Sequence, residues 1–504
     1  MNKKIIMGCL GILAVTASFT ACKKEDGQEK EDTGYVWTKD GGLDACSRIL
    51  FSDGKEDSEG KDIGNGNQEF VFTGKQTLAK GTYHLKGWVY IADGAELTIE
   101  PGAVVKGDKA TMAALVVERG GKLIARGTRN EPIVFTSGQE AGSRKPGDWG
   151  GVILCGKARN NQTEMIIEGG PRSKHGGDED SDNSGVLSYV RIEFAGYPFK
   201  TDKEINGLTL GSVGSGTQID HIQVSYSNDD SIEWFGGCSN AKYLIAWKGW
   251  DDDFDTDNGF SGTVQFALAV RDSRIADVSQ SNGFESDNCA DGAEVTPFTS
   301  AVFSNVTFVG PKLDASFVND ADYINGGALY PNNGSALGKF QAAMQIRRNS
   351  RLNCINSIAV GYPVGLMLDN QKGDTQGAAQ QGLMKIENVW FAGMDVTGSD
   401  ANKCYEDVLV TGYDENSKPV YDKTQKSFST TYFLAQKGNR VLDGWDSILS
   451  SDGFTPFAGS AVLNAASFEG ASSSFTEVSF IGAIGTSENW MDGWTEFDPE
   501  NAEY

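Results

Sequence analysis

Residues 221–235, HIQVSYSNDDSIEWF, align with residues 243–257, YLIAWKGWDDDFDTD, at a constant offset of 22. DDFDTDN (252–258) then matches NGFESDN (282–288) at an offset of 30, and GLMLDN (365–370) matches GFESDN (283–288) at an offset of 82. Repetition at variable intervals is typical of a solenoid with loops inserted between its repeats. The first alignment pairs Ile222 with Leu244, Asp229 with Asp251, Asp230 with Asp252 and Glu233 with Asp255.

The same chain also repeats a short apolar strand that ends at glycine. It occurs as YVRIEFAG from 189, NVTFVG from 305, NVWFAG from 388 and EVSFIG from 477. Apolar and polar residues alternate in these runs, which indicates strands rather than helices. A propeller would need repeats of about 40 residues, and a β-sandwich needs no self-similarity. We therefore predict an all-β chain folded as a single-stranded, right-handed parallel β-helix.

This coil is expected to span residues 81–504, with loops inserted at about 311–341 and 396–465. Both segments break the repeat, and a short helix is predicted within the second one, between Phe433 and Leu442. Loop insertions in a solenoid tend to lie on one face, which is often the binding face.

Composition and charge restrict the function. The chain has 504 residues, 63 of them glycine, and a formal net charge of −25. Nucleic acid is bound mainly through Lys and Arg on phosphate, so this balance argues against a nucleic-acid partner. Cations and neutral ligands are the better expectation.

The N-terminus, MNKKIIMGCLGILAVTASFTAC, has a basic start, a short apolar run and small residues before Cys22. Residues 1–21 are therefore predicted to be a signal peptide. Phe19 to Cys22 resembles a bacterial lipobox, which implies cleavage before Cys22 and its acylation, so that Cys22 attaches the chain to outer-membrane lipid. Residues 22–80 are expected to form an acidic tether and an N-terminal cap. The charged run KKEDGQEKEDTG resembles the surface-export signal of Bacteroidota-type lipoproteins, which implies an outer-membrane protein facing the cell exterior. A linker facing the periplasm is the alternative.

Six further cysteines are widely spaced and form no CxxC pair, so a zinc site is not expected. The predicted location outside the cytoplasm allows a disulfide, but the sequence does not indicate which cysteines would pair. They are Cys46, Cys155, Cys238, Cys289, Cys354 and Cys404.

Several longer segments are similar to those of β-helix lipoproteins of Bacteroidota, which have a pectin-lyase-like fold and a largely undefined function. The segments are GDWGGVILCGKA (147–158), NDDSIEWFGG, DFDTDNGFSGTVQF and FIGAIGTSENWMDGWTEFDP. The resemblance covers about Gly81 to Pro499 and implies the fold. It implies no activity, because the family carries no agreed catalytic motif.

Carboxylates are concentrated between Asp229 and Asp287. In adjacent coils the aligned acids lie about 4.8 Å apart, where two like charges repel by roughly 3 to 4 kcal/mol at an effective dielectric constant of 20. Calcium, which prefers oxygen ligands, would relieve this repulsion. Solvated turns and acids that cap the backbone are the alternative, since Asp also favours turns. The predicted metal ligands are Asp229, Glu233, Asp251, Asp253, Asp255, Asp257, Glu285 and Asp287.

Catalysis is a second hypothesis for the same acids. The NDD at 228–230 resembles the paired acids of polygalacturonase-type hydrolases, but the companion His-Gly and Arg-Ile-Lys motifs have no match in this chain. If the protein is an enzyme, the catalytic residues are Asp229, Asp230, Asp251 and Asp252. A polysaccharide lyase would need a base, for which Lys174, Arg347, Arg348 and Arg351 are candidates. His175 is predicted to be an exposed loop residue.

Aromatic residues within the acidic stretch favour a binding function. Exposed aromatic rings stack on sugars or contact protein partners, and Trp234, Trp247 and Trp250 are the candidates. We therefore predict a non-catalytic, lipid-anchored surface protein that binds a glycan, a host or matrix component, or a partner protein, with calcium as a possible stabilising ion. A polysaccharide lyase or glycoside hydrolase is the first alternative, and a structural surface scaffold is the second.

Overall fold

Short strands recur along the chain from Cys46 to Leu442 in the computed structural model. The structure describes residues 46–55, 61–162, 165–167, 172–200, 203–320, 322–324, 333, 336–485 and 489–504. The predicted signal peptide, the lipidation site Cys22 and residues 23–45 of the predicted tether lie outside the described residues. The coil begins before its predicted start at residue 81, because residues 62–63, 70–72 and 75–78 already form strands of its two sheets. Among the residues described, no helix is long and apolar enough to cross a membrane.

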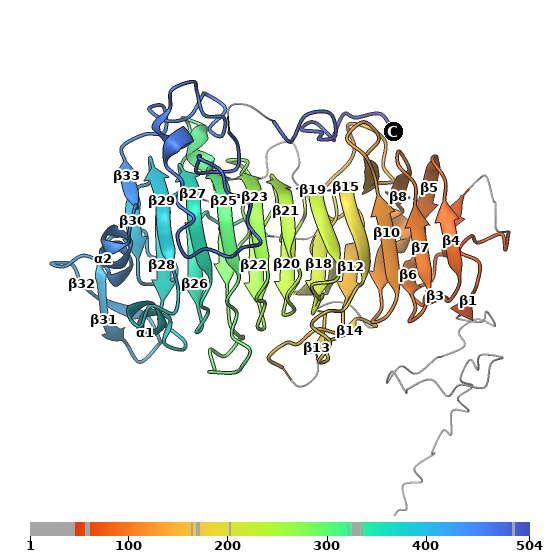
Figure 1. The fold of residues 1–504 in the computed structure, drawn as a ribbon, viewed down its shortest axis with the longest axis horizontal. Coiled ribbons are helices and arrows are strands. Elements are labelled where there is room, and N and C mark those ends of the chain that lie inside the picture. Colours follow the sequence, from red (N-terminus) through yellow and green to blue (C-terminus); the bar gives the residue numbers. More distant parts are fainter. Residues whose placement is uncertain are drawn as a thin grey trace, which may run out of the picture. The chain divides into compact units, whose positions relative to one another are not determined.

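The chain winds through two long sheets in which neighbouring strands run parallel, as Figure 1 shows. This architecture confirms the predicted parallel β-helix. The short-strand sheet has 12 strands in the order β1 (Cys46–Ser47), β3 (Phe70–Phe72), β6 (Trp88–Ile91), β9 (Ala114–Val117), β12 (Gly151–Cys155), β18 (Leu208–Gly211), β20 (Ile232–Phe235), β22 (Phe254–Asp257), β24 (Phe284–Ser286), β26 (Ala342–Arg347), β28 (Val364–Asp369) and β30 (Val396–Ser399).

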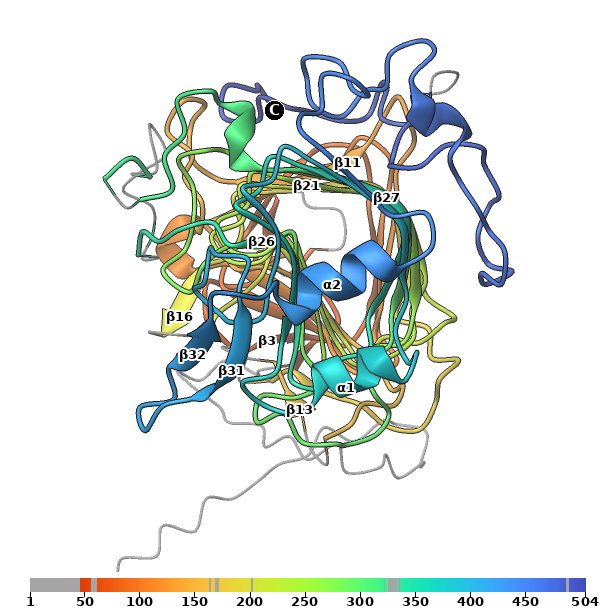
Figure 2. The ribbon, with the colours of Figure 1, turned by 90° about the vertical axis from the view of Figure 1, so that its left-hand side faces the viewer.

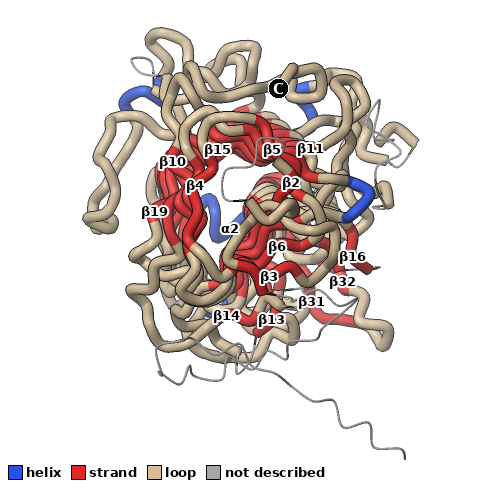
Figure 3. Tube along the Cα trace, turned by 90° about the vertical axis from the view of Figure 1, so that its right-hand side faces the viewer, coloured by secondary structure: helices blue, strands red, loops and turns tan. Residues whose placement is uncertain are grey.

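The long-strand sheet has 15 strands. Its main path is β2 (Asp62–Ile63), β5 (Thr82–Leu85), β8 (Val104–Gly107), β11 (Ile133–Ser137), β15 (Gly185–Glu193), β19 (Gln218–Ser225), β21 (Ala241–Trp247), β23 (Thr263–Val270), β25 (Val302–Val309), β27 (Asn353–Val360), β29 (Ile386–Ala392) and β33 (Arg440–Leu442). A side path of β4 (Lys75–Leu78), β7 (Glu96–Ile99) and β10 (Lys122–Arg126) joins β15. Figure 3 shows the strands enclosing the coil interior, with the loops outside them.

Each long strand from β15 to β29 bends at one residue with a positive φ. The side path explains the bend, because β10 and β11 are separate strands that both pair with β15. Bulky residues rarely adopt positive φ, but here stacking with the neighbouring coils holds them: the ring centroids of Tyr189 and His221 lie 4.1 Å apart, and those of His221 and Tyr243 lie 4.4 Å apart. This bend column consists of Tyr189, His221, Tyr243, Phe266, Asn305, Asn356 and Asn388.

The interior is a ladder of apolar side chains. Ile232, Phe254 and Phe284 are Cα partners in successive coils and are fully buried. Because side chains alternate across a strand, their neighbours in sequence face outward. Burial of this continuous ladder is the main source of coil stability.

The predicted loop at 396–465 is partly a further coil. It contains β30 and β33, which extend the two sheets, the hairpin of β31 (Leu409–Tyr413) and β32 (Pro419–Asp422), and the helix α2 (Phe428–Ala435). The helix therefore precedes its predicted position, because Ser427 caps it at residue 428 and the chain returns to the long-strand sheet at Arg440. As Figure 2 shows, α2 lies across the end of the coil, where it contacts β28 and β30.

Shorter elements decorate the coil. They are the helix α1 (Thr375–Gln380), the hairpins β13 (Met165–Ile166) with β14 (Lys174–His175) and β16 (Pro198–Lys200) with β17 (Lys203–Glu204), and 3-10 turns at Lys109–Thr111, Pro311–Leu313 and Ala461–Asn464. Within the predicted insertion at 311–341, Asn333 donates to the carbonyl of Pro146 at 2.7 Å and Leu337 bridges to Asp277.

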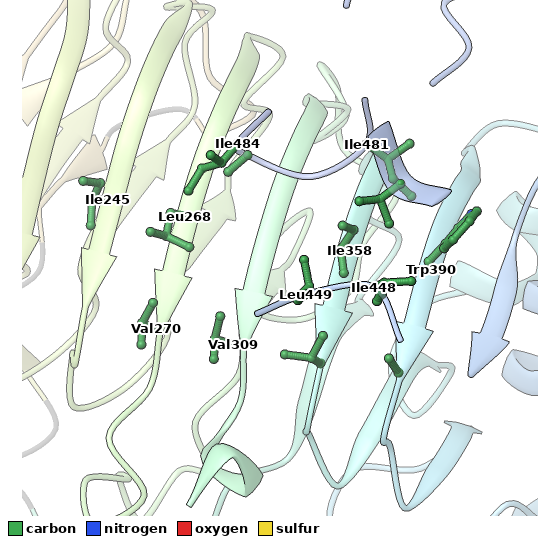
Figure 4. Packing of buried hydrophobic residues seen from close by; sticks show 14 of the residues in the cluster. Ile245, Leu268, Val270, Val309, Ile358, Trp390, Ile448, Leu449, Ile481 and Ile484 are labelled. Atoms are coloured by element: carbon green, nitrogen blue, oxygen red, sulfur yellow. The ribbon is translucent and has the colours of Figure 1, made fainter. Parts of the chain in front are cut away.

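Residues 446–504, called the strap here, run back over the outer face of the long-strand sheet. Their apolar side chains pack on outward residues of β21 to β29, as Figure 4 shows for Ile481 and Ile484 above Ile358 and Leu268. Side-chain amides of the sheet also bond to the strap backbone: Gln223 donates to the carbonyl of Glu496 at 2.5 Å and accepts from its N–H at 2.9 Å. EVSFIG (477–482) belongs to this strap, so its prediction as a coil strand was wrong. Its apolar residues pack on the sheet surface instead of pairing with another coil.

Candidate functional site

Acidic side chains gather on the outer face of the short-strand sheet. Glu233, Asp255 and Glu285 are Cα partners in β20, β22 and β24, so the predicted column across three coils is confirmed. In the next coil the column continues with the neutral Gln345. Three carboxylates therefore face outward in register, about 4.8 Å apart from coil to coil.

Two further acids cap the turns that precede these strands. Asp230 Oδ1 accepts the backbone N–H of Asp252 at 2.8 Å, and Asp252 Oδ1 accepts that of Asn282 at 2.5 Å. Asn282 in turn accepts the N–H of Ala342 at 3.0 Å. Each side chain thus satisfies a backbone donor of the following coil. The capping alternative raised by the sequence describes Asp230 and Asp252 well.

Burial and mutual repulsion make the acids reluctant to ionise. Burial raises the pKa of Asp230 well above its ordinary value, and Asp229, Asp255 and Glu233 raise it further. The pKa of Asp255 is also raised well above normal, by burial first and then by Glu233 and Glu285. A bound cation would offset this repulsion, as would retained protons.

Arginines neutralise part of the cluster. Arg271 and Asp253 form a fully buried pair at 2.9 Å, and Arg347 contacts both Glu285 and Asp287. Asp253 was predicted to be a metal ligand; in the structure its carboxylate accepts from Arg271 and from the Tyr362 hydroxyl. Glu285 and Asp287 likewise have an arginine where a cation was predicted.

The remaining acids form two groups with the spacing of a metal site. Oxygen atoms of Asp229, Asp230 and Asp251 all lie within 4.8 Å of one another, and so do those of Asp230, Glu233 and Asp255. Asp257 is in neither group, and its Oδ1 accepts the N–H of Asn258 at 2.5 Å. Asp230, shared by both groups, was predicted only as a catalytic residue.

The second group also has buried oxygens without hydrogen-bond partners among the described residues. They are Asp255 Oδ1, Asn206 Oδ1 and Thr209 Oγ1. The amide of Asn206 donates to Glu233, and Thr209 is the Cα partner of Glu233. Leaving a buried polar atom unsatisfied costs about 1 to 3 kcal/mol, so these atoms indicate a missing partner. The sequence could have indicated Thr209. Aligning IEWF (232–235) with LTLG (208–211) of the preceding coil places Thr209 beside Glu233.

Two of the three predicted ligand-binding tryptophans are closed off from solvent. The side chains of Trp234 and Trp250 are fully buried: Trp234 stacks on Phe260 with ring centroids 5.2 Å apart. Trp247 is half-buried and lies 4.5 Å from the ring of Phe497 in the strap. The binding role predicted for Trp234 and Trp250 is therefore corrected to a role in the core.

The other candidate bases are scattered. Lys174 lies in the β13–β14 hairpin, and Arg351 lies 3.4 Å above the ring of Phe298. His175 was predicted to be exposed, but it is buried against Ser212 at 2.8 Å, and burial lowers its pKa to about 3. A buried neutral imidazole is a structural group rather than a base exchanging protons at neutral pH.

Replacing Asp252 tests the capping ladder. Asp252→Asn keeps the acceptor for Asn282 and removes a charge, whereas Asp252→Ala also leaves that backbone donor unpaired, at a cost of about 1 to 3 kcal/mol. Without divalent cations at pH 8, Asp252→Asn should match or exceed the wild type in free energy of unfolding, and Asp252→Ala should fall below it.

The dependence on pH has a definite sign. Burial, then Glu285 and Asp255, raise the pKa of Asp252 in the folded state above its value in the unfolded chain. The contribution of Asp252 to the free energy of unfolding is therefore fully present at low pH. It is lost as the pH rises through the folded-state pKa. Urea unfolding at pH 5 and pH 8 should show a smaller decrease for Asp252→Asn than for the wild type. An equal decrease would contradict the burial of this charge.

Comparison with known proteins agrees with the fold. The model of the family described as pectate-lyase-like β-helix domain matches residues 71–431. Curated proteins give no match to the chain. Among solved structures, the Dettilon tailspike protein (gp208) is similar at 11% identity and a TM-score of 0.25, with 65% of this chain and 59% of that chain covered. The chain thus spans less than two thirds of that protein.

Proposed function

Because this chain belongs to the family of pectate-lyase-like β-helix domains, we propose that it is a non-catalytic binding protein whose coil holds a calcium ion for contact with a glycan. The observation that carries the proposal is the group of Asp230, Glu233 and Asp255, with the buried Asp255 Oδ1 lacking a partner among the described residues. Calcium takes six to eight oxygen ligands. Three carboxylates and the Asn206 amide oxygen leave positions for water or for a ligand's hydroxyl or carboxylate oxygen.

The rim of the cluster supports contact with a ligand. Asp229, Asp251 and Asp255 are only half-buried, so the ion would not be sealed from solvent. A polyuronide would be repelled by the negative charge of the carboxylates alone. A bound calcium ion would make the local charge attractive to it. Binding of an acidic glycan is therefore expected to require the ion.

Of the candidate bases for a lyase, Arg347 and Arg348 lie at the cluster, where Arg348 contacts Asp287 and Arg347 contacts Glu285 and Asp287. Burial lowers the pKa of Arg347, but Glu285 and Asp287 outweigh it, so that the pKa lies above its ordinary value. An arginine held this way keeps its proton and cannot abstract one. Unsaturated products or new reducing ends after incubation with polygalacturonate would overturn the non-catalytic proposal.

The proposed location is the outer membrane, with acylated Cys22 as the anchor and the coil facing the cell exterior. The lipobox-like sequence before Cys22 supports it, as does the acidic run that follows. Incorporation of labelled fatty acid that is lost in Cys22→Ala, together with protease sensitivity of intact cells, is the expected result. Incorporation that persists in Cys22→Ala would contradict the anchor.

Calcium removal tests the proposal directly. Adding calcium at about 100 times its Kd should raise the free energy of unfolding by roughly 2.7 kcal/mol, seen as a higher Tm than in chelator. The increase should be larger at pH 8 than at pH 5.5, because protons compete for acids with raised pKa values. Asp255→Asn should abolish it and Glu415→Gln, at an exposed site, should retain it.

Binding of oligogalacturonate by calorimetry gives the second measurement. It should occur with calcium, disappear in chelator and be lost in Asp255→Asn. A Tm that ignores calcium in the wild type, with no co-purified ion, would remove the metal from the proposal.

A further inference from the structure

A cavity lies on the opposite side of the coil from the carboxylates, between the long-strand sheet and the strap. Its volume is about 410 Å³, within the roughly 300 to 1,000 Å³ of sites for small ligands. Outward residues of β25, β27 and β29 form the floor, and strap residues 467 and 469–472 form the wall. Figure 2 shows this strap loop standing away from the sheet beside β27. We call this cavity the strap groove.

A second cavity of about 330 Å³ lies farther along the coil axis on the same sheet. Thr263 in its lining is the Cα partner of Val302, and Val302 is the partner of Asn353 in the first cavity. The two cavities therefore lie over the same strand positions in successive coils, about 4.8 Å apart per coil. In the second cavity the lining residue Lys242 attaches the strap by donating to the Thr476 hydroxyl at 2.9 Å.

The charge of the strap groove differs from that of the whole chain. Its lining has two cations and two anions, and Lys437 is paired with Glu469 at 2.6 Å. The other two, Lys385 and Glu387, are also of opposite sign. The chain as a whole has a net charge of −25. A charge-balanced cavity on an acidic protein disfavours a polyanion and accepts a neutral ligand.

The rest of the lining matches a polyhydroxylated ligand. Ser467 and Ser472 supply hydroxyl groups, and Val302, Ile355 and Ala471 supply an apolar surface. Sugars present both hydroxyl groups and apolar C–H faces, so both kinds of surface contribute to binding. Alignment of the two cavities along the coil fits a linear chain of sugars rather than a single ring.

We propose that the strap groove binds a neutral oligosaccharide. This site is separate from the calcium cluster, lies on the other sheet and uses no metal. It goes beyond the proposed function, because ligand binding here should be the same with and without calcium.

The test uses the full soluble chain and isothermal titration with neutral hexasaccharides of glucose, xylose and mannose in chelator. At least one should bind with a measurable Kd. Ser472→Trp, which fills the groove from the exposed strap, should weaken that binding at least tenfold. Ser473→Trp, a neighbouring exposed residue outside the lining, is the matched control and should change the Kd less than twofold.

Three outcomes would overturn the proposal: no neutral hexasaccharide binds, the two tryptophan variants bind equally well, or only hexagalacturonate binds. The two proposals fail separately. Asp255→Asn should leave binding of the neutral hexasaccharide intact while it abolishes the calcium effect, and Ser472→Trp should do the reverse.

Discussion

Arg271→Ala should lower the free energy of unfolding by about 3 to 5 kcal/mol, as expected when one partner of a buried ion pair is removed. Both side chains of the pair are fully buried. Besides Asp253, Arg271 donates to the backbone carbonyls of Asp251 at 2.5 Å and Trp250 at 3.3 Å. Its loss would leave these acceptors and the Asp253 carboxylate unsatisfied.

The same residue connects the coil to the inserted segment. The Arg271 guanidinium lies 5.4 Å from the ring centroid of Phe340, where the chain re-enters the coil before β26. We therefore expect Arg271→Ala to increase protease cleavage within residues 311–341 as well as to lower stability.

Two controls define the result for Arg271. Lys423→Ala removes the exposed ion pair with Glu406, which should cost less than about 1 kcal/mol. Combining Arg271→Met with Asp253→Leu removes both charges and should recover part of the lost stability. A loss for Arg271→Ala no greater than that for Lys423→Ala, measured by urea unfolding, would contradict the role given to the buried pair.

Trp494→Ala should also cost about 3 to 5 kcal/mol, the range for removing a fully buried large aromatic side chain. The ring of Trp494 is fully buried and lies edge-on to Tyr189 and His221 of the bend column, with centroids 5.8 Å and 5.7 Å away. Its indole N–H donates to the carbonyl of Trp490 at 2.8 Å. This side chain therefore contributes strongly to holding the strap on the coil.

Limited proteolysis separates loosening of the strap from general unfolding. In Trp494→Ala, cleavage within residues 446–504 should precede cleavage of the coil. Phe457→Ala is the control, because that ring is 39% exposed. If Trp494→Ala and Phe457→Ala have equal effects on the urea midpoint, the strap does not depend on this contact.

The fold could be predicted because successive coils repeat the same acids and apolar residues in register. The offset of 22 between Glu233 and Asp255 is also the offset of their Cα partnership in the sheet. The strap could not be predicted in this way, because its sequence does not align in register with a neighbouring coil. Its backbone is bonded by Gln223, Gln265 and Asn305, which lie far from it in sequence.

The candidate site was predicted in part. The alignment of Glu233 with Asp255 and Glu285 in one column was predicted correctly, but not that the column faces outward. Once Glu233 is known to face outward, alternation along β20 requires its neighbour Trp234 to face inward. The sequence did not show which acids are paired with arginine. Arg271 and Arg347 reach Asp253 and Glu285 from other coils, and the local sequence pattern does not indicate these pairs.

The strap also constrains the order in which the molecule can be completed. Arg144 is almost fully buried and bonds to the carbonyl of Pro499, 355 positions later in the chain, and Glu193 accepts from the Tyr504 hydroxyl, 311 positions later. During synthesis or export, the early coils emerge long before these partners exist. Until the strap docks, Arg144 lacks its acceptor at Pro499 and Glu193 lacks its donor at Tyr504, so docking of the distant segment completes the bonding of these buried charges.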